Sequence, residues 1–81
     1  LDIVAREGQS IVFVEVKTRS GLLYGEPAEA VTRTKARRIR VLATLWLGEH
    51  RPPGTWDLRF DVVSVLRASG SPEVLHLRGA F

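Results

Sequence analysis

The sequence predicts an α/β (α+β) fold: a mixed β-sheet and one helix, in the order strand, strand, helix, strand, strand. Stretches rich in β-branched residues occur in the first and last thirds of the chain, and one segment with helical periodicity lies between them. A helix that connects two strands of one sheet makes a right-handed crossover, which requires those two strands to be parallel. The 81 residues are 44% hydrophobic and 26% charged, which is typical of a single globular domain, residues 1–81.

The segment from 11 to 17 forms the centre of the predicted sheet. A run of apolar residues precedes one carboxylate and one ammonium there, Glu15 and Lys17. Alternate side chains of a strand share a face, so both charges lie on the face of Phe13. Burial of an unpaired charge lowers the stability of the fold by roughly several kcal/mol, so these two charges need partners or a function.

Residues 1–7 alternate loosely and are predicted to pair with that central strand. Gly8 and Gln9 suit a two-residue type II′ turn, in which glycine adopts a positive φ. Facing residue numbers then sum to seventeen, which places Asp2 opposite Glu15. Directly opposed carboxylates repel each other and raise each other's pKa, and a cation between them removes both penalties.

A helix is predicted from Thr32, a good N-cap, to Leu47, with Gly48 as its stop and Pro52-Pro53 barring continuation. One face of this helix is apolar at the 3.6-residue period and comprises Ala36, Ile39, Leu42, Ala43 and Trp46. Arg33, Arg37 and Arg40 are predicted to line the far face.

The remaining segments are a loop at 18–25, a short helical turn at 27–31, a strand at 56–66 and a final short strand at 74–77. Asp61 is expected to pair with a basic neighbour, and His76 to be structural rather than a metal ligand. Trp46 and Trp56 are expected in the core or at an interface.

The composition limits the function classes. Cysteine is absent, no apolar run reaches membrane-spanning length, and no signal peptide precedes the first strand. We therefore expect a cytoplasmic protein with no membrane partner. Because a single helix covers only one face of the sheet, and the chain opens within a strand pattern, we expect an N-terminal helix or a partner chain to cover the other face.

The charged residues indicate metal-assisted chemistry on a phosphodiester. Two carboxylates without nearby His or Cys suit Mg²⁺ or Mn²⁺, so Asp2 and Glu15 are the predicted ligands, and Lys17 is placed to orient water or offset charge. Basic residues without intervening acids suit the nucleic-acid backbone. The predicted contacts are Arg19, Arg33, Lys35, Arg37, Arg38 and Arg40.

Two stretches carry a resemblance to a known family. Leu1-Asp2-Ile3-Val4-Ala5 followed by Phe13-Val14-Glu15-Val16-Lys17-Thr18-Arg19 resembles the Asp…Glu-x-Lys core of the PD-(D/E)xK, restriction-endonuclease-like superfamily. The match is closer to its YraN branch of uncharacterised bacterial proteins, which is similar in fold to Holliday-junction resolvases. The pattern continues in Pro27-Ala28-Glu29-Ala30-Val31, in Lys35 and Arg38, in Arg59-Phe60-Asp61-Val62-Val63, and in His76 near Ala80-Phe81.

The resemblance implies a Mg²⁺-dependent endonuclease with Asp2, Glu15 and Lys17 as catalytic residues. DNA, branched or otherwise structured, is favoured over RNA, and a homodimer would supply the two active sites that a junction requires. Family members carry a further N-terminal segment, a helix and then a Gly-Glu pair, which this sequence lacks. Glu29 is an additional candidate ligand, although an acid at a helix start also favours the macrodipole. The alternative function is a non-catalytic nucleic-acid- or protein-binding module on the same fold.

Overall fold

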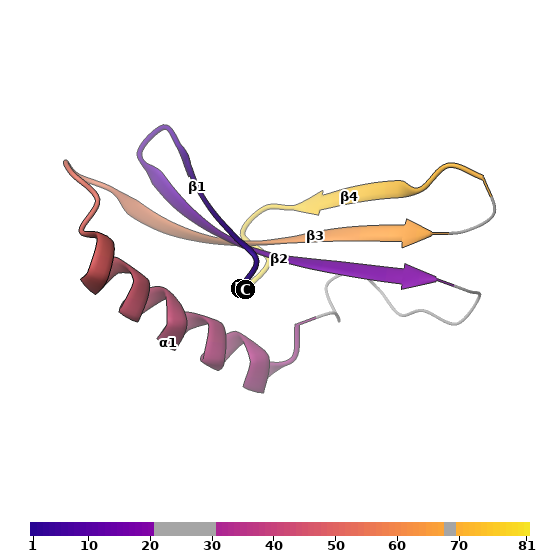
Figure 1. The fold of residues 1–81 in the computed structure, drawn as a ribbon, viewed down its shortest axis with the longest axis horizontal. Helices are drawn as coiled ribbons and strands as arrows, with labels where there is room; N and C mark the ends of the chain where they lie inside the picture. Colours follow the sequence, from indigo (N-terminus) through magenta and orange to yellow (C-terminus); the bar gives the residue numbers. More distant parts are fainter. Residues whose placement is uncertain (21–30, 68–69) are drawn as a thin grey trace.

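The alternation between apolar strands and one amphipathic helix produces the predicted α+β fold. The structure is a computed structural model, and it describes residues 1–20, 31–67 and 70–81. The elements are β1 (Ile3–Glu7), β2 (Ser10–Ser20), α1 (Arg33–His50), β3 (Asp57–Arg67) and β4 (Glu73–Leu77). Figure 1 shows α1 on one side of the sheet, while β2, β3 and β4 extend beyond the helix.

The four strands form one sheet in the order β1-β2-β3-β4. β1 and β2 are antiparallel, and their facing residue numbers sum to seventeen from the pair Ile3–Val14 to the pair Glu7–Ser10, as predicted. Gly8 has a φ of +59°, so the turn between these strands uses the conformation that glycine tolerates best. β2 and β3 are parallel, which confirms the crossover through α1.

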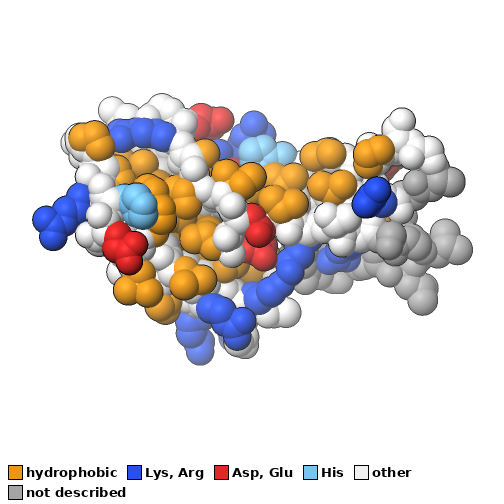
Figure 2. Space-filling model, in the orientation of Figure 1, with side chains coloured by type: hydrophobic (Ala, Val, Ile, Leu, Met, Phe, Trp, Pro, Cys, Tyr) orange, Lys and Arg blue, Asp and Glu red, His pale blue; other side chains and the backbone are white. Residues whose placement is uncertain are grey.

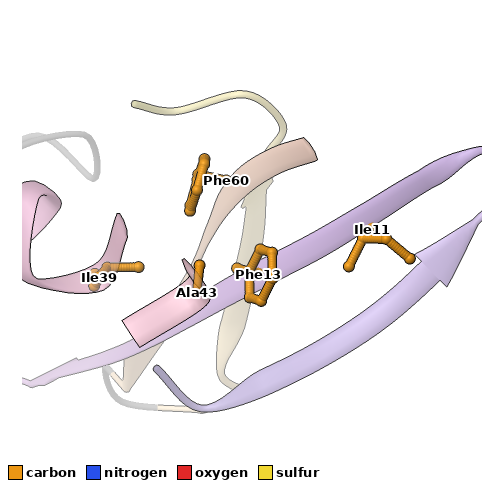
Figure 3. Close-up of a cluster of buried hydrophobic side chains, with 5 residues drawn as sticks. All are labelled: Ile11, Phe13, Ile39, Ala43 and Phe60. Atoms are coloured by element: carbon orange, nitrogen blue, oxygen red, sulfur yellow. The ribbon is translucent and has the colours of Figure 1, made fainter. Parts of the chain in front are cut away.

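The core lies between α1 and the sheet face that carries Phe13. Alternation along β2 places Ile11 and Phe13 on that face, and Phe13 pairs in register with Phe60 of β3. The rings of Phe13 and Phe60 stack with centroids 5.5 Å apart. Ile39 and Ala43 of α1 pack onto these rings (Figure 3), so the face shared by Phe13, Glu15 and Lys17 is the one toward the helix.

The helix begins as predicted but ends later. Thr32 is the N-cap, and its Oγ1 accepts a hydrogen bond from the Lys35 N–H at 3.2 Å. The predicted stop at Gly48 is wrong, because α1 continues to His50. The helix ends where Arg51 adopts the left-handed conformation, with φ of 44°, and donates its N–H to the Leu47 carbonyl.

Two further sequence predictions need correction. Thr18 and Arg19 were expected in a loop, but both pair with β3 and prolong β2. Leu42 was expected in the apolar face toward the core, but it is 41% exposed, because the sheet-facing stripe is narrow and centres on Ile39 and Ala43. Residues 21–25 of the predicted loop and 27–30 of the predicted helical turn lie outside the described residues.

The opposite face of the sheet carries valines and a polar cluster. Val12 and Val14 are buried there although no described helix covers them, because the neighbouring strands flank them at Ala5 and Arg59 and at Ile3 and Asp61. Among the described residues, no helix is long and apolar enough to cross a bilayer.

Candidate functional site

Glu15 is a buried carboxylate at the end of the apolar part of β2. It is 9% exposed, and it follows the core residue Phe13 on the helix-facing side of the strand. Its Oε1 lies 3.7 Å from Nζ of Lys17, the residue two positions along the same face. Its Oε2 lies 2.9 Å from the α-ammonium of Leu1, but accepts no hydrogen bond from a side chain or a backbone amide of the described residues.

This carboxylate is therefore poorly satisfied for its burial. A buried carboxylate normally accepts several hydrogen bonds, because desolvation of the charge is costly. An α-ammonium exists only at a chain start, and a residue joined ahead of Leu1 would convert that nitrogen into a neutral amide. Among the described residues, Lys17 at 3.7 Å is then the ion-pair partner that Glu15 retains.

Asp2 lies directly before β1 and caps the hydrogen-bond ladder between β1 and β2. Its N–H donates to the Val14 carbonyl at 3.0 Å. Its Oδ2 accepts the N–H of Val16 at 2.8 Å, a donor that would bond to the Leu1 carbonyl if the ladder continued in register. A carboxylate accepts at about four lone-pair positions, so this bond leaves capacity for a further ligand.

The first turn of α1 brings a second lysine to this end of β2. Lys35 lies beside Lys17, and the adjacent Lys17 side chain, together with partial burial, lowers the pKa of Lys35 while Glu15 opposes that shift. Lys35 was predicted only as a nucleic-acid contact. Its spacing of four from the buried Ile39 was a usable signal, because residues four apart share one face of a helix.

The other predicted nucleic-acid contacts differ in their location and exposure. Arg33, Arg37 and Arg38 are exposed on α1, and Arg19 is half-buried in β2. The prediction that Arg40 lines the far face is wrong, because its guanidinium lies 4.5 Å from the centroid of the Phe60 ring. Figure 2 shows Lys and Arg side chains along the side of the molecule where the N-terminal half of α1 lies.

The carboxylate oxygens of Asp2 and Glu15 are negatively charged, hard donors, and such donors suit a small divalent cation. Mg²⁺ is often held by one or two carboxylates, with water and substrate oxygens completing its octahedron. In the part of the chain that the structure describes, no group of three or more His, Cys, Asp or Glu residues could hold a metal ion. Glu29, the additional candidate, lies outside the described residues. A site here would therefore use the two-carboxylate arrangement.

A second buried carboxylate, Asp61 of β3, lies on the opposite face of the sheet. It pairs in register with Val14, one position from Glu15. Its carboxylate is fully buried and accepts two hydrogen bonds from Arg59, both of 2.9 Å. The predicted pairing with a basic neighbour is thus confirmed, in the bidentate geometry that favours arginine.

Two more groups complete the surroundings of Asp61. His76 of β4 lies with Nε2 2.7 Å from Oδ2, and the Gly79 N–H donates to Oδ1 at 3.0 Å. Arg59 also donates to Glu7 of β1 at 3.0 Å, so the cluster joins three strands. Burial opposes the charged form of Asp61, but the bonds from Arg59, Gly79 and His76 outweigh it and lower its pKa to about 2.

Comparison with known proteins identifies related sequences over almost the whole chain. Residues 1–65 match the family described as "Uncharacterised protein family UPF0102". A UPF0102 protein of Beutenbergia cavernae is 56% identical over 80 residues, covering 98% of this chain and 67% of its own length. One of Nocardia farcinica is 57% identical over 83 residues, covering 100% of this chain and 64% of its own length. The chain thus spans about two-thirds of the length of these relatives.

Proposed function

The chain belongs to the UPF0102, or YraN, family, and we propose that it is a metal-dependent endonuclease. The proposed reaction is hydrolysis of DNA phosphodiester bonds, with Mg²⁺ or Mn²⁺ as the cofactor. A DNA substrate would place this activity in the cytoplasm of a bacterial cell. The proposal rests on the residues at the ends of β1 and β2.

The observation that supports it most strongly is the unsatisfied oxygen of Glu15. The residue is 9% exposed, yet Oε2 accepts no hydrogen bond from a side chain or a backbone amide of the described residues, and its one close cation is the α-ammonium of Leu1 at 2.9 Å. A buried charge with so few partners needs a compensating interaction, because a well-packed apolar residue would be more stable at the same position. A divalent cation would provide that compensation, and Asp2, which directly precedes the first β1–β2 pair, Ile3–Val14, is the proposed second oxygen ligand.

Each residue of the site then has a defined task. Asp2 and Glu15 would hold the cation, which supplies Lewis acidity and a bound water of lowered pKa when present. Lys17, whose ammonium lies 3.7 Å from Glu15, would hold the attacking water in line and offset charge on the phosphoryl oxygens. Lys35 would add a second ammonium for the same phosphate, which explains why two like charges are held side by side.

Binding of DNA would use the basic side of α1. Arg33, Arg37 and Arg38 are exposed on this helix. The first turn of the helix carries Lys35, which lies beside Lys17 of the proposed site. Phosphate contacts of this kind fix the position of a duplex without reading its sequence. We therefore expect cleavage that depends on DNA structure more than on sequence, and binding that weakens steeply with salt.

The test is a cleavage assay with junction, flap and linear DNA, with and without Mg²⁺ or Mn²⁺, on the full-length protein. Glu15→Gln and Lys17→Ala should each reduce cleavage about 100-fold or more while the far-ultraviolet circular dichroism stays unchanged. Glu73→Gln is the matched control, because Glu73 is exposed on β4, and β3 lies between β4 and the strand that carries Glu15. It should cleave like the wild type.

The alternative, a binding module without catalysis, predicts other results. Its charges are a structural ion cluster, so DNA binding would be sensitive to salt and indifferent to Mg²⁺. Loss of the folded state on Glu15→Gln, or equal cleavage by the wild type and this variant, would refute the nuclease proposal.

A further inference from the structure

An open pocket of about 260 Å³ lies between β1, the C-terminal part of α1 and the connector of residues 51–56. Apolar side chains from all three segments line it, among them Val4, Trp46 and Pro53, and of the described residues that line it Arg6 alone is charged. Ligand pockets begin at about 300 Å³, so this volume suits one planar ring better than a larger molecule. The pocket shares no residue with the carboxylate site or with the basic side of α1.

Rigid rings form the helix side of the pocket. Trp46 is half-buried, and its ring lies against the core ring of Phe13 with centroids 5.8 Å apart. His50 stacks on the same indole at 4.2 Å, with 11° between the two rings. The Pro52 carbonyl accepts a hydrogen bond from Nε1 of Trp56 at 3.1 Å, which holds the connector in place. Walls of this kind keep their shape without a ligand, and they suit a flat, largely apolar group such as a nucleobase.

Arg6 adds a fixed polar group at the edge of the pocket. Its Nη1 donates to the Pro53 carbonyl at 3.0 Å, and its Nε donates to the Gly8 carbonyl at 3.3 Å. A guanidinium carries more N–H donors than these two bonds use, and its plane can stack on a base or donate to the acceptors of a base edge. Arg6 therefore favours a nucleobase over the hydrocarbon side chain of a partner protein, because a hydrocarbon offers no acceptor.

The pocket lies on the same face of the sheet as the carboxylate site. Arg6 pairs in register with Ile11, and alternation along β2 places Ile11 on the face of Glu15. Glu15 follows Ile11 by four residues, which is about 13 Å at roughly 3.3 Å per residue. One strand of a duplex covers that distance in about four nucleotides at about 3.4 Å each, and an extended strand covers it in fewer. A base in the pocket thus belongs to a nucleotide close to the phosphate that Lys17 would contact.

We propose that this pocket binds one unpaired nucleobase, from a nucleotide within about four positions of the phosphodiester bond that is cleaved. The base is unpaired, because a base that is stacked and paired in a duplex cannot enter a pocket. This inference rests on the proposed DNA cleavage and adds its substrate class, which is DNA with an unpaired nucleotide beside the cleaved bond. Fully paired DNA must first unstack a base, so it is cleaved more slowly.

Binding of the base can be measured in EDTA, where the result is independent of cleavage. The full-length protein is titrated into a DNA hairpin with a single-stranded tail, in which the fluorescent base 2-aminopurine replaces one tail base at a time. Stacking against aromatic rings quenches this fluorescence. The wild type should quench it at one tail position, and an abasic site at that position should weaken binding about tenfold.

Filling the pocket tests where the base binds. Pro53→Phe places a ring in the pocket, so it should abolish the quenching and bind the normal tail about as weakly as the wild type binds the abasic one. Pro53 is exposed, so the melting temperature should change little. Pro72→Phe is the matched control, because Pro72 is an exposed proline that directly precedes β4. It should quench like the wild type.

Removal of the guanidinium tests the polar contact. Arg6→Gln should bind the normal tail about tenfold more weakly, and this loss should largely disappear with the abasic tail, because two changes to one contact are not additive. Arg67→Gln removes the same charge from an exposed arginine at the end of β3. It should weaken binding of both tails equally, and by less than Arg6→Gln weakens binding of the normal tail.

Cleavage in Mg²⁺ gives a second measurement. The abasic tail should lower kcat/KM of the wild type about tenfold, and it should cause no further loss in Pro53→Phe. A merely structural role of Pro53 would not remove the difference between the two tails.

The pocket and the nuclease fail on different results. Cleavage by the wild type without quenching at any tail position, or quenching that survives Pro53→Phe, would refute the base pocket and leave the nuclease proposal intact. Quenching that Pro53→Phe removes, without cleavage in either metal, would support the base pocket and refute the nuclease. A pocket that serves a protein partner instead predicts equal binding of the normal and abasic tails, which would also refute the proposal.

Discussion

Two buried carboxylates lie one position apart in neighbouring strands, on opposite faces of the sheet, and their surroundings differ. Asp61 receives hydrogen bonds from two nitrogens of Arg59 and from the Gly79 N–H, and it pairs with His76. Glu15 has Lys17 at 3.7 Å from Oε1 and the α-ammonium of Leu1 at 2.9 Å from Oε2, an oxygen that accepts no hydrogen bond from a side chain or a backbone amide of the described residues. Both are buried, so burial alone does not distinguish a structural carboxylate from a functional one.

The number of donors around each carboxylate differs, and the nuclease proposal depends on that difference. The donors around Asp61 come from β3, β4 and the turn after β4, so they fix how these segments fit together. Full satisfaction leaves Asp61 little capacity for a ligand. Glu15 gains less from its neighbours and retains capacity for a cation, which is the pattern expected of a residue kept for function.

The largest expected effect is on stability. Asp61→Ala should lower the free energy of unfolding by about 3–5 kcal/mol, because it leaves Arg59 and the Gly79 N–H without their buried partner. Glu15→Gln should change it by less than about 1 kcal/mol, since it neutralises a poorly satisfied charge. Urea unfolding followed by circular dichroism measures both. Equal losses would remove the distinction between the two carboxylates.

Divalent cations should affect only the site of Glu15. Saturation to ten times the dissociation constant stabilises a protein by about 1.4 kcal/mol, which corresponds to a melting-temperature increase of roughly 5–10 °C for a domain of this size. Mg²⁺ should produce this increase in the wild type and in Glu73→Gln. Differential scanning fluorimetry should detect no increase for Glu15→Gln, and an increase that persists in this variant would place the cation elsewhere.

Acid should weaken the Asp61 cluster within a defined range of pH. The pKa of Asp61 in the folded chain is about 2, below its ordinary value of 3.8. The unfolded state therefore binds a proton first, so the stabilisation from Asp61 is fully present above about pH 4 and is lost as the pH falls through about 2. The difference in urea midpoint between the wild type and Asp61→Asn should shrink over this range. A constant difference would contradict the assignment.

The smallest effect is expected at the outer end of the cluster. Glu7 accepts a hydrogen bond from Arg59 at 3.0 Å, but its side chain is 63% exposed. Arg59 lowers the pKa of Glu7, yet solvent and salt screen an exposed pair. Glu7→Gln should therefore lower the melting temperature only slightly, and the loss should vanish at high salt. A loss as large as that of Asp61→Ala would mean that Glu7 holds Arg59 in place.

Local patterns predicted the framework of the site. The glycine of the β1–β2 turn fixed the register, which leaves Asp2 at the position adjacent to the first β1–β2 pair. Alternation along β2 predicted that Glu15 and Lys17 share the face of Phe13. Both predictions depend on interactions between residues that are near each other in the chain, which is why one sequence is sufficient for them.

Contacts between distant segments were harder to predict. The stacking of Arg40 on Phe60, and the position of Lys35 beside Lys17, depend on how α1 is rotated against the sheet. The continuation of the helix past Gly48 likewise shows that glycine alone does not end a helix, because the left-handed residue that does so is Arg51. Propensity is a weak guide where tertiary packing decides.

The sequence by itself determined the order of the elements, the parallel crossover and the face on which Glu15 and Lys17 lie, because turn geometry and side-chain alternation are local. Only the tertiary structure decided which buried carboxylate is satisfied. The donors to Asp61 come from residues 2, 15 and 18 positions away in the chain, and they meet only when β4 pairs with β3. The hydrogen bonds around a buried charge form only when the sheet assembles, because the donors come from several strands.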